Sequence, residues 1–167
     1  AVGTSAPTYS PVISGNSWFY CEVTCASGPT MGASAVLAVT GVLTNVVPYT
    51  GNNTFACGTN MILTDHAGTG NYATYANGYT VLEAGFAGVI NITGSYATES
   101  CCDRVNIYDG VGTGGTLLQT YAGNGTANYT GTPGQTLTVQ FLSDVSLEYA
   151  GFDFTVTYSG MCSAVVC

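Results

Sequence analysis

The sequence predicts an all-β protein, a sandwich or barrel of antiparallel strands. Three observations lead to this fold class. Apolar and polar residues alternate with a period of two in several stretches, 23 glycines interrupt the chain, and the strong helix formers Glu, Lys, Gln and Arg are few. Such alternation buries one face of each strand and leaves the other face to solvent, which is typical of antiparallel sheets.

The first 47 residues carry the weakest strand pattern. Residues 1–20 are small and polar and include Pro7 and Pro11, so we expect an extended arm there. Residues 34–47 could line one face of a helix. However, this stretch is rich in valine and contains Gly41, and both features favour strands. We therefore expect β-structure in this stretch.

Four later stretches alternate clearly, at residues 88–93, 104–108, 136–142 and 151–158. The side chains expected to face the core are Ile90, Ile92, Val105, Ile107, Leu137, Val139, Phe141, Phe152, Phe154, Val156 and Tyr158. Those expected to face solvent are Asn91, Arg104, Asn106, Tyr108, Thr138, Gln140, Asp153, Thr155 and Thr157. The second stretch ends at Asp109 and Gly110, a strong turn signal.

Charged residues are scarce and almost all acidic. The chain has nine acids, the single cation Arg104, and a formal net charge of −8. Such a chain cannot neutralise phosphates, which argues against nucleic acid as a partner. It also lacks a basic patch for an anionic membrane surface. The longest nearly apolar stretch, residues 34–47, is too short and too interrupted to span a bilayer.

Seven cysteines predict disulfide bonds and an oxidising, extracellular compartment. They are Cys21, Cys25, Cys57, Cys101, Cys102, Cys162 and Cys167. Zinc is the competing explanation, but zinc sites need Cys-x2-Cys pairs or several histidines, and His66 is the only histidine. The pairing cannot be deduced from spacing. The odd cysteine is either free or bonded to another chain.

Four Asn-x-Ser/Thr sequons agree with an extracellular glycoprotein. They begin at Asn52, Asn91, Asn124 and Asn128. Each sequon alone is weak evidence in a chain rich in Asn and Thr, but together with the cysteines they predict N-linked glycans. Glycans would supply the solubility that the missing charges do not.

From residue 57 to about residue 160 the order of motifs resembles a CUB domain. The densest match is Asp-Arg-Val-Asn-Ile-Tyr-Asp-Gly at residues 103–110. Before it come Val89–Ile92, Tyr96 and Glu99, and after it come Leu117-Leu118, Gly123, residues 136–146 and Gly151-Phe152. This resemblance implies a jelly-roll-like sandwich of two antiparallel sheets. It leaves residues 21–56 as an added β segment that Cys21 and Cys25 tie down, and residues 161–167 as a cysteine-containing tail.

The cysteines depart from the family pattern. The family has two bridges, and Cys57 matches the first cysteine while its partner, expected near Gly78, is missing. Cys101 or Cys102 lies near the third position, and the fourth is absent. The resemblance therefore implies that Cys57 pairs with Cys101 or Cys102, or with Cys162.

The resemblance also implies a calcium site at Glu99, Asp103 and Asp144, with Ser146 as a carbonyl ligand. Calcium takes six to eight oxygen ligands. Converging carboxylates without a cation repel each other by roughly 4 kcal/mol per close pair at an effective dielectric constant near 20. Strand alternation turns Arg104 away from Asp103. The alternative is that these are three ordinary loop acids.

Other candidate residues have simpler explanations. Asp109 fits a turn position, and His66 beside Asp65 fits a solvated loop better than an acid–base site. Tyr72, Tyr75 and Tyr79 could bind carbohydrate, but core packing and sheet-face pairing are favoured. The chain has no nucleophile elbow, no zinc-protease motif and no phosphate-binding loop, so we expect no enzymatic activity.

These observations predict a secreted, glycosylated structural or interaction module that acts by contact with other proteins. Copies of the chain itself are among the expected partners, because a surface with so few charges does little to prevent association. The uncharged arm could pair with a neighbour's sheet edge and build a filament or matrix. The alternative is a calcium-dependent module that binds or adheres to a protein or carbohydrate ligand.

Overall fold

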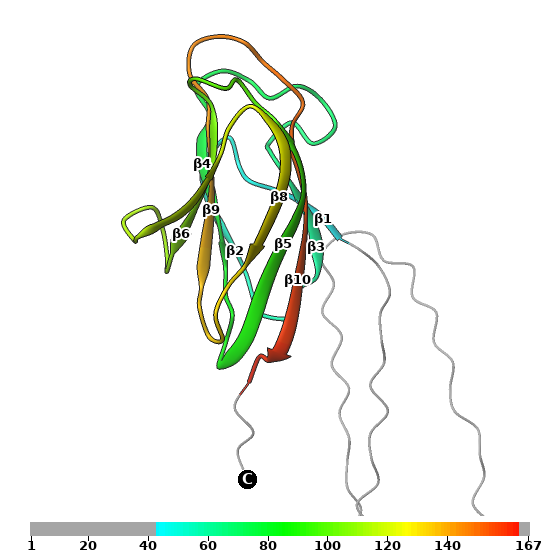
Figure 1. The fold of residues 1–167 in the computed structure, drawn as a ribbon, viewed down its shortest axis with the longest axis vertical. Coiled ribbons are helices and arrows are strands. Elements are labelled where there is room, and N and C mark those ends of the chain that lie inside the picture. Colours follow the sequence, from blue (N-terminus) through cyan, green and yellow to red (C-terminus); the bar gives the residue numbers. More distant parts are fainter. Residues whose placement is uncertain (1–42, 164–167) are drawn as a thin grey trace, which may run out of the picture. The chain divides into compact units, whose positions relative to one another are not determined.

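The computed structural model describes residues 43–163, in which ten strands form two five-stranded sheets (Figure 1). Sheet A has the order β1 (Leu43–Val46), β3 (Met61–Thr64), β10 (Gly151–Met161), β5 (Ala87–Ala97) and β8 (Asn124–Thr130). Sheet B has the order β2 (Thr50–Phe55), β4 (Asn77–Leu82), β9 (Leu137–Leu142), β6 (Arg104–Asp109) and β7 (Leu117–Tyr121). The predicted all-β sandwich is confirmed.

The four stretches with the clearest alternation form strands at or next to the centre of each sheet. The four alternating stretches lie in β5, β6, β9 and β10. The sheets are mixed, however, rather than purely antiparallel, because β1 pairs with β3 and β2 with β4 in parallel. Alternation reports which face of a strand is buried and not its direction, so these two edge pairings were not predicted.

The predicted boundary at residue 57 falls between β2 and β3. Strands β1 and β2 come from the segment expected to be an addition, and they pair with β3 and β4. Of the ambiguous stretch 34–47, Leu43–Val46 forms a strand. The expected arm at residues 1–20, together with Cys21, Cys25 and Cys167, lies outside the described residues. Within residues 43–163 no helix has the length and apolar character needed to cross a membrane.

Inward-facing side chains of both sheets form one core, as the alternation predicted. Fully buried members include Ile90, Ile92, Phe154 and Val156 from sheet A, and Val105, Ile107, Leu137, Val139 and Phe141 from sheet B. Burying a side chain of this size contributes about 1.5–3 kcal/mol. The core is therefore the main source of stability for the loops described below.

Asn106 corrects one sequence expectation. It lies on the outer face of sheet B, as predicted, but it is buried rather than solvated. Its side chain accepts a 2.8 Å hydrogen bond from the Thr120 hydroxyl, and its amide lies 3.5 Å from Gln140 Oε1. Gln140, also expected to face solvent, is buried and donates to Asn77 Oδ1 at 2.9 Å. Hydrogen bonds to polar side chains on neighbouring strands thus accompany the burial of Asn106 and Gln140 on the face that alternation predicts to be exposed to solvent.

Strand register brings three connecting loops to the same end of the sandwich. Arg104 is opposite Leu142 in sheet B, and Gly151 is opposite Ala97 in sheet A. The β5–β6 loop and the β9–β10 loop therefore meet there, and the β3–β4 loop joins them (Figure 1). The candidate site lies among these three loops.

Candidate metal centre

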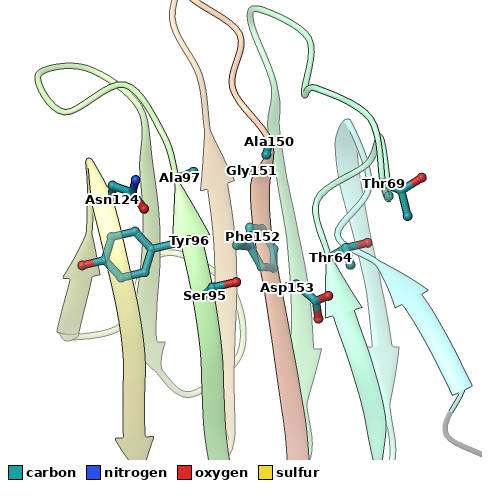
Figure 2. Close-up of a pocket in the computed structure, with 11 residues that line it drawn as sticks. Thr64, Thr69, Ser95, Tyr96, Ala97, Asn124, Ala150, Gly151, Phe152 and Asp153 are labelled. Atoms are coloured by element: carbon teal, nitrogen blue, oxygen red, sulfur yellow. The ribbon is translucent and has the colours of Figure 1, made fainter.

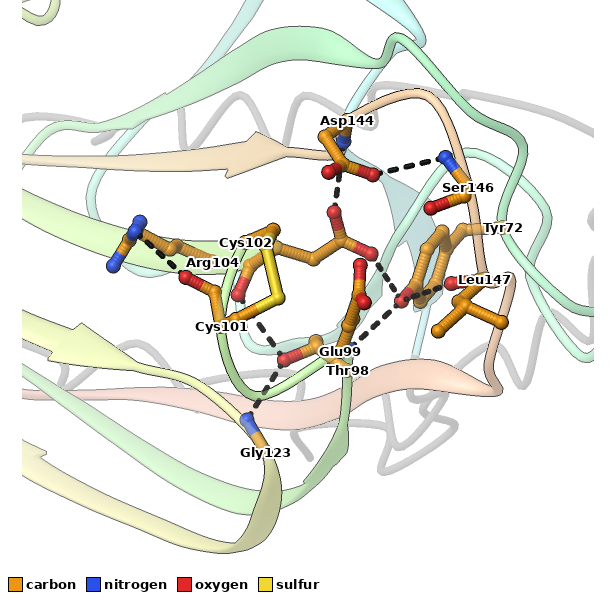
Figure 3. Close-up of a disulfide and its surroundings, with 11 residues drawn as sticks. Tyr72, Thr98, Glu99, Cys101, Cys102, Arg104, Gly123, Asp144, Ser146 and Leu147 are labelled. Carbon is orange, nitrogen blue, oxygen red and sulfur yellow. Dashed lines mark hydrogen bonds between the residues drawn. A yellow bond between two sulfur atoms is a disulfide. The ribbon is translucent and has the colours of Figure 1, made fainter.

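The three predicted carboxylates converge. Glu99 and Asp103 belong to the β5–β6 loop and Asp144 to the β9–β10 loop, and each places an oxygen within 4.8 Å of the other two. Figure 3 shows Glu99 and Asp144 on these two loops. Asp103 is fully buried, while Glu99 and Asp144 are half-buried. Residues that are 41 positions apart in the chain, such as Asp103 and Asp144, thus share one site.

Hydrogen bonds fix the two aspartates. The backbone amide of Asp144 donates to Asp103 Oδ1 at 2.8 Å, and the amide of Ser146 donates to Asp144 Oδ1 at 2.9 Å. The Asp103 amide also donates to the Glu99 carbonyl at 3.3 Å. Ser146 therefore supports Asp144 through its amide, and its expected role as a carbonyl ligand remains a prediction.

Tyr72 is a member of this site that the sequence did not indicate. Its hydroxyl donates to Asp103 Oδ2 at 2.5 Å and accepts the Glu99 amide at 3.0 Å, while the Leu147 carbonyl lies 3.2 Å away. Its ring is buried and packs edge-on against Phe141, with 4.9 Å between the centroids. Core packing, the favoured explanation for Tyr72, is thus confirmed, but its hydroxyl also joins all three loops.

The pKa of the Tyr72 phenol agrees with its role as a hydrogen-bond donor. Burial raises the pKa of the Tyr72 phenol, and its hydrogen bond to Asp103 raises it further. The phenol therefore keeps its proton at neutral pH and remains a donor. The Asp103 Oδ2 atom is the acceptor of its hydrogen bond.

Glu99 is the least satisfied of the three acids. Its Oε2 atom is buried and has no hydrogen-bond partner among the described residues. Burial raises the pKa of the Glu99 carboxyl, and the nearby Asp144 and Asp103 carboxylates raise it further. Arg104 does not relieve this repulsion, because its guanidinium donates to the Cys101 carbonyl at 3.0 Å (Figure 3). An unpartnered buried oxygen facing two more carboxylates fits a hard cation such as calcium.

Two disulfide bonds are present within residues 43–163. Cys57 is bonded to Cys162, which is one of the expected alternatives, and its pairing with Cys101 or Cys102 is wrong. Cys101 and Cys102 are bonded to each other, between Glu99 and Asp103 in the β5–β6 loop. Spacing alone could not choose among these pairings. A cysteine at position 78 would not fit, since a Cβ on Gly78 would lie 1.8 Å from the Pro48 carbonyl oxygen.

His66 and Asp65 differ from the expected solvated loop. His66 is half-buried between Tyr49 and Phe141, and its Nε2 accepts the Ala73 amide at 3.0 Å. Burial lowers the pKa of His66 and raises that of the fully buried Asp65. The Asp65 carboxylate accepts backbone amides at both oxygens. Both residues therefore hold the β3–β4 loop in place.

Two of the remaining candidates, Asp109 and Tyr79, lie on strands outside the three loops. Asp109 occupies its expected turn, where Gly110 has a φ of +84° and Gln135 donates to Asp109 Oδ1. Tyr75 is exposed in the β3–β4 loop and Tyr79 is half-buried on β4. Of the three clustered tyrosines, Tyr72 bonds to an acid of the site through its side chain, and Tyr75 donates its backbone amide to the Asp144 carbonyl at 2.8 Å.

A shallow pocket of about 310 Å³ lies at the loop end of sheet A (Figure 2). Its polar lining includes Thr64, Ser95 and Asn124, and Asp153 supplies its one carboxylate. Paired carboxylates, which glycoside hydrolysis requires, are therefore missing from this pocket.

All four sequons lie on strands. Asn52 is on β2, Asn91 on β5, and Asn124 and Asn128 on β8. Asn52, Asn124 and Asn128 are exposed, and Asn91 is half-buried with its Oδ1 accepting the Thr130 hydroxyl. The sequence expectation that Asn91 faces outward is confirmed by this position, since its neighbours Ile90 and Ile92 face the core.

Two layers of five strands, each with one parallel pairing at an edge, define the described part of the chain as a CUB-like β-sandwich. Among solved structures the chain is similar to the CUB1-EGF-CUB2 domain of human MASP-1/3, with a TM-score of 0.51 and 15% sequence identity. The match covers 65% of this chain and 41% of that one. No protein-family profile and no curated protein matches the sequence. The resemblance inferred from the motifs is thus confirmed at the level of the fold.

Proposed function

We propose that this chain is a non-catalytic extracellular interaction module that binds calcium at Glu99, Asp103 and Asp144. The ion holds the three loops in one arrangement, and the loop surface then contacts a protein partner. A CUB-like fold supports the extracellular setting and a role in protein contacts. The four sequons and the two disulfides support secretion and N-glycosylation.

The observation that carries the calcium assignment is the state of Glu99. Its buried Oε2 has no hydrogen-bond partner in the described structure, and two further carboxylate oxygens lie within 4.8 Å of its ligand atom. Calcium at this point would receive several oxygens and cancel the repulsion. The Ser146 carbonyl and water would complete its coordination. The chain's own role is to hold the three acids in place before the ion arrives.

The loops around the carboxylates expose apolar side chains that suit a protein contact. Tyr75 is 63% exposed in the β3–β4 loop, and Val145 and Leu147 are 62% and 56% exposed in the β9–β10 loop. Exposed apolar patches with polar rims mark protein interaction sites. A basic side chain of the partner would approach the acids while these groups pack around it.

Calcium titration of the purified protein tests the assignment. We expect one bound ion by isothermal titration calorimetry and at least a tenfold loss of affinity in Glu99→Gln. Glu83→Gln is the matched control, because Glu83 is exposed in the β4–β5 connection, away from the three loops. No calcium heat in the parent, or an equal loss in both variants, contradicts the assignment.

The proposed N-glycosylation is tested separately. We expect enzymatic removal of N-glycans to lower the mass of the secreted protein, most readily through the exposed sites Asn52, Asn124 and Asn128. Conversion of these asparagines to aspartate, read by peptide mass spectrometry, identifies the occupied sites. An unchanged mass refutes the proposed glycans.

Self-association is a second candidate, and the outer face of sheet A favours it. On β10 and β5 this face presents exposed Thr and Ser side chains, and Asp153 is its one acid. The sequon residues Asn124 and Asn128 lie beside them on β8, so association through this face requires that these two sites carry no glycan. The outer edges of β1 and β8 are also unpaired in sheet A. Unpaired edges invite pairing with another chain. Light scattering at rising concentration and electron microscopy test for a filament, and a monomer at every concentration refutes it.

A further inference from the structure

Glu99 belongs to two groups of metal-ligating side chains. One is the carboxylate group with Asp103 and Asp144. The other consists of Glu99 with Cys101 and Cys102, whose ligand atoms also lie within 4.8 Å of one another. The two sulfurs are joined in a disulfide in this structure. The second group therefore becomes available only when that bond is reduced.

We propose that reduction of the Cys101–Cys102 bond creates a second metal site, formed by the two thiolates and the Glu99 carboxylate, for a thiophilic divalent cation such as zinc. This cation competes with calcium for Glu99, and that competition rests on the proposed calcium function. The oxidation state of the two cysteines thereby selects which class of cation the β5–β6 loop binds.

The loop is accessible and held in place. Cys101 is exposed and Cys102 is half-buried, so a reductant and an ion can both reach the sulfurs. Arg104 donates to the Cys101 carbonyl, and the Asp103 amide donates to the Glu99 carbonyl. Both bonds are accepted by backbone carbonyls rather than by the sulfurs, so reduction breaks neither of them directly. The proposal requires that the loop backbone keeps both cysteine side chains beside Glu99 after reduction.

The chemistry balances with a dithiol as the reductant. The dithiol gives two electrons and two protons, the S–S bond of Cys101 and Cys102 breaks, two thiols form, and the dithiol becomes a disulfide. Zinc then displaces one proton from each thiol and accepts two sulfurs, one Glu99 oxygen and a water, which completes a tetrahedral site.

Hard and soft ligand preferences separate the two sites. Calcium takes oxygen ligands and does not gain from thiolates, whereas zinc and cadmium bind thiolates well. The buried Glu99 Oε2, which has no hydrogen-bond partner within residues 43–163, is the oxygen that both ions would use. One carboxylate cannot serve both ions in full, so occupation of either site weakens the other.

Cadmium is a suitable probe, because its bonds to thiolates give an ultraviolet charge-transfer band. The experiment uses the full chain with Cys21, Cys25 and Cys167 changed to serine, which removes thiols outside the described residues. After treatment with a dithiol and its removal under argon, we expect one cadmium to bind with this band. The oxidised protein should show no band.

Variants assign the band to its ligands. The dithiol can also reduce the Cys57–Cys162 bond, so the decisive variant is Cys57→Ser/Cys162→Ser, in which Cys101 and Cys102 are the only thiols left. It should retain the band under conditions in which circular dichroism shows that it is folded. Glu99→Gln should keep the band but weaken cadmium binding by roughly tenfold or more, as expected when a ligand group is disturbed. Absence of the band in folded Cys57→Ser/Cys162→Ser, or a cadmium affinity that Glu99→Gln leaves unchanged, overturns the proposal.

Calcium titration of the cadmium-loaded protein tests the competition. We expect calcium affinity to fall at least tenfold when cadmium is bound. Unchanged calcium affinity overturns the sharing of Glu99. If the oxidised protein binds no calcium at all, the proposed function fails, while the cadmium band still decides whether the thiolate site exists.

Discussion

The hydroxyl of Tyr72 donates a 2.5 Å hydrogen bond to the carboxylate of Asp103, although the two residues are 31 positions apart. The same hydroxyl accepts the amide of Glu99. One phenol in the β3–β4 loop thus fixes both acids of the β5–β6 loop. The positions of these carboxylates depend on a residue that carries no charge itself.

Replacing Tyr72 with phenylalanine should destabilise the protein by about 1–3 kcal/mol, because it leaves the buried Asp103 oxygen and the Glu99 amide without their partner. Chemical denaturation followed by circular dichroism measures this loss. Tyr158→Phe is the matched control, since the buried Tyr158 hydroxyl has no hydrogen-bond partner in the described part of the chain. We expect no loss there, and equal losses in both variants would contradict the role of Tyr72.

Gly94 should not tolerate alanine. It lies within β5 with a φ of +152°, and a Cβ there would come 2.0 Å from the Asp153 carbonyl oxygen of the neighbouring β10. Overpacking costs about 1–3 kcal/mol, and backbone strain adds a similar amount. Thermal unfolding should therefore show a large loss in Gly94→Ala and none in Gly114→Ala, where a Cβ meets nothing within 4 Å. Similar melting temperatures for the two variants would refute this account.

Acidification should destabilise the β3–β4 loop because it protonates His66. Burial lowers the pKa of His66 below its ordinary 6.5, so the unfolded chain takes up the proton more readily than the folded protein does. Stability should then fall as the pH drops below about 6.5, until the lower folded pKa is reached. A protonated imidazole can no longer accept the Ala73 amide.

Nuclear magnetic resonance measures this pKa without ambiguity, because His66 is the only histidine in the chain. We expect a midpoint below 6.5 and, in the same pH range, faster hydrogen exchange at the Ala73 amide. The variant His66→Gln should lack the part of the stability loss that follows imidazole protonation. A midpoint at or above 6.5 would contradict the lowering of the His66 pKa by burial.

Loss of the Cys57–Cys162 bond should destabilise the protein strongly. The bond joins residues 105 positions apart, so it restricts the unfolded chain far more than a short loop would. In Cys57→Ser/Cys162→Ser we expect a loss of about 2–5 kcal/mol in denaturant unfolding. Cys101→Ser/Cys102→Ser is the control, because that bond joins adjacent residues and should cost much less. The opposite ranking would refute this explanation.

The sequence predicted the centre of the sandwich better than its edges. Residues such as Ile107 and Val139 alternate with polar neighbours because one face of each central strand is buried. Strands β1 and β2 are short and mostly exposed, so their burial left little periodic signal. Their parallel pairing depends on how the chain crosses from one sheet to the other, and no local sequence pattern indicates that path.

The sequence likewise predicted one part of the site and missed another. Glu99, Asp103 and Asp144 could be named from the motifs around them, and the structure brings their carboxylates together. Tyr72 could not, because it lies in a loop without periodicity and resembles eleven other tyrosines. Nor could the bond between Cys101 and Cys102 be chosen over other pairings, since sequence spacing does not report which sulfurs meet.

Strand β10 is placed between β3 and β5 in sheet A, although it is the last strand of the described chain. Until residue 161 has left the ribosome, β3 and β5 therefore lack the strand that joins them, and Cys162 cannot yet meet Cys57. Sheet A therefore remains incomplete until β10 has been synthesised. Every strand of sheet B precedes residue 143, so sheet B can form before sheet A, whose central strand must pair with partners made much earlier in the chain.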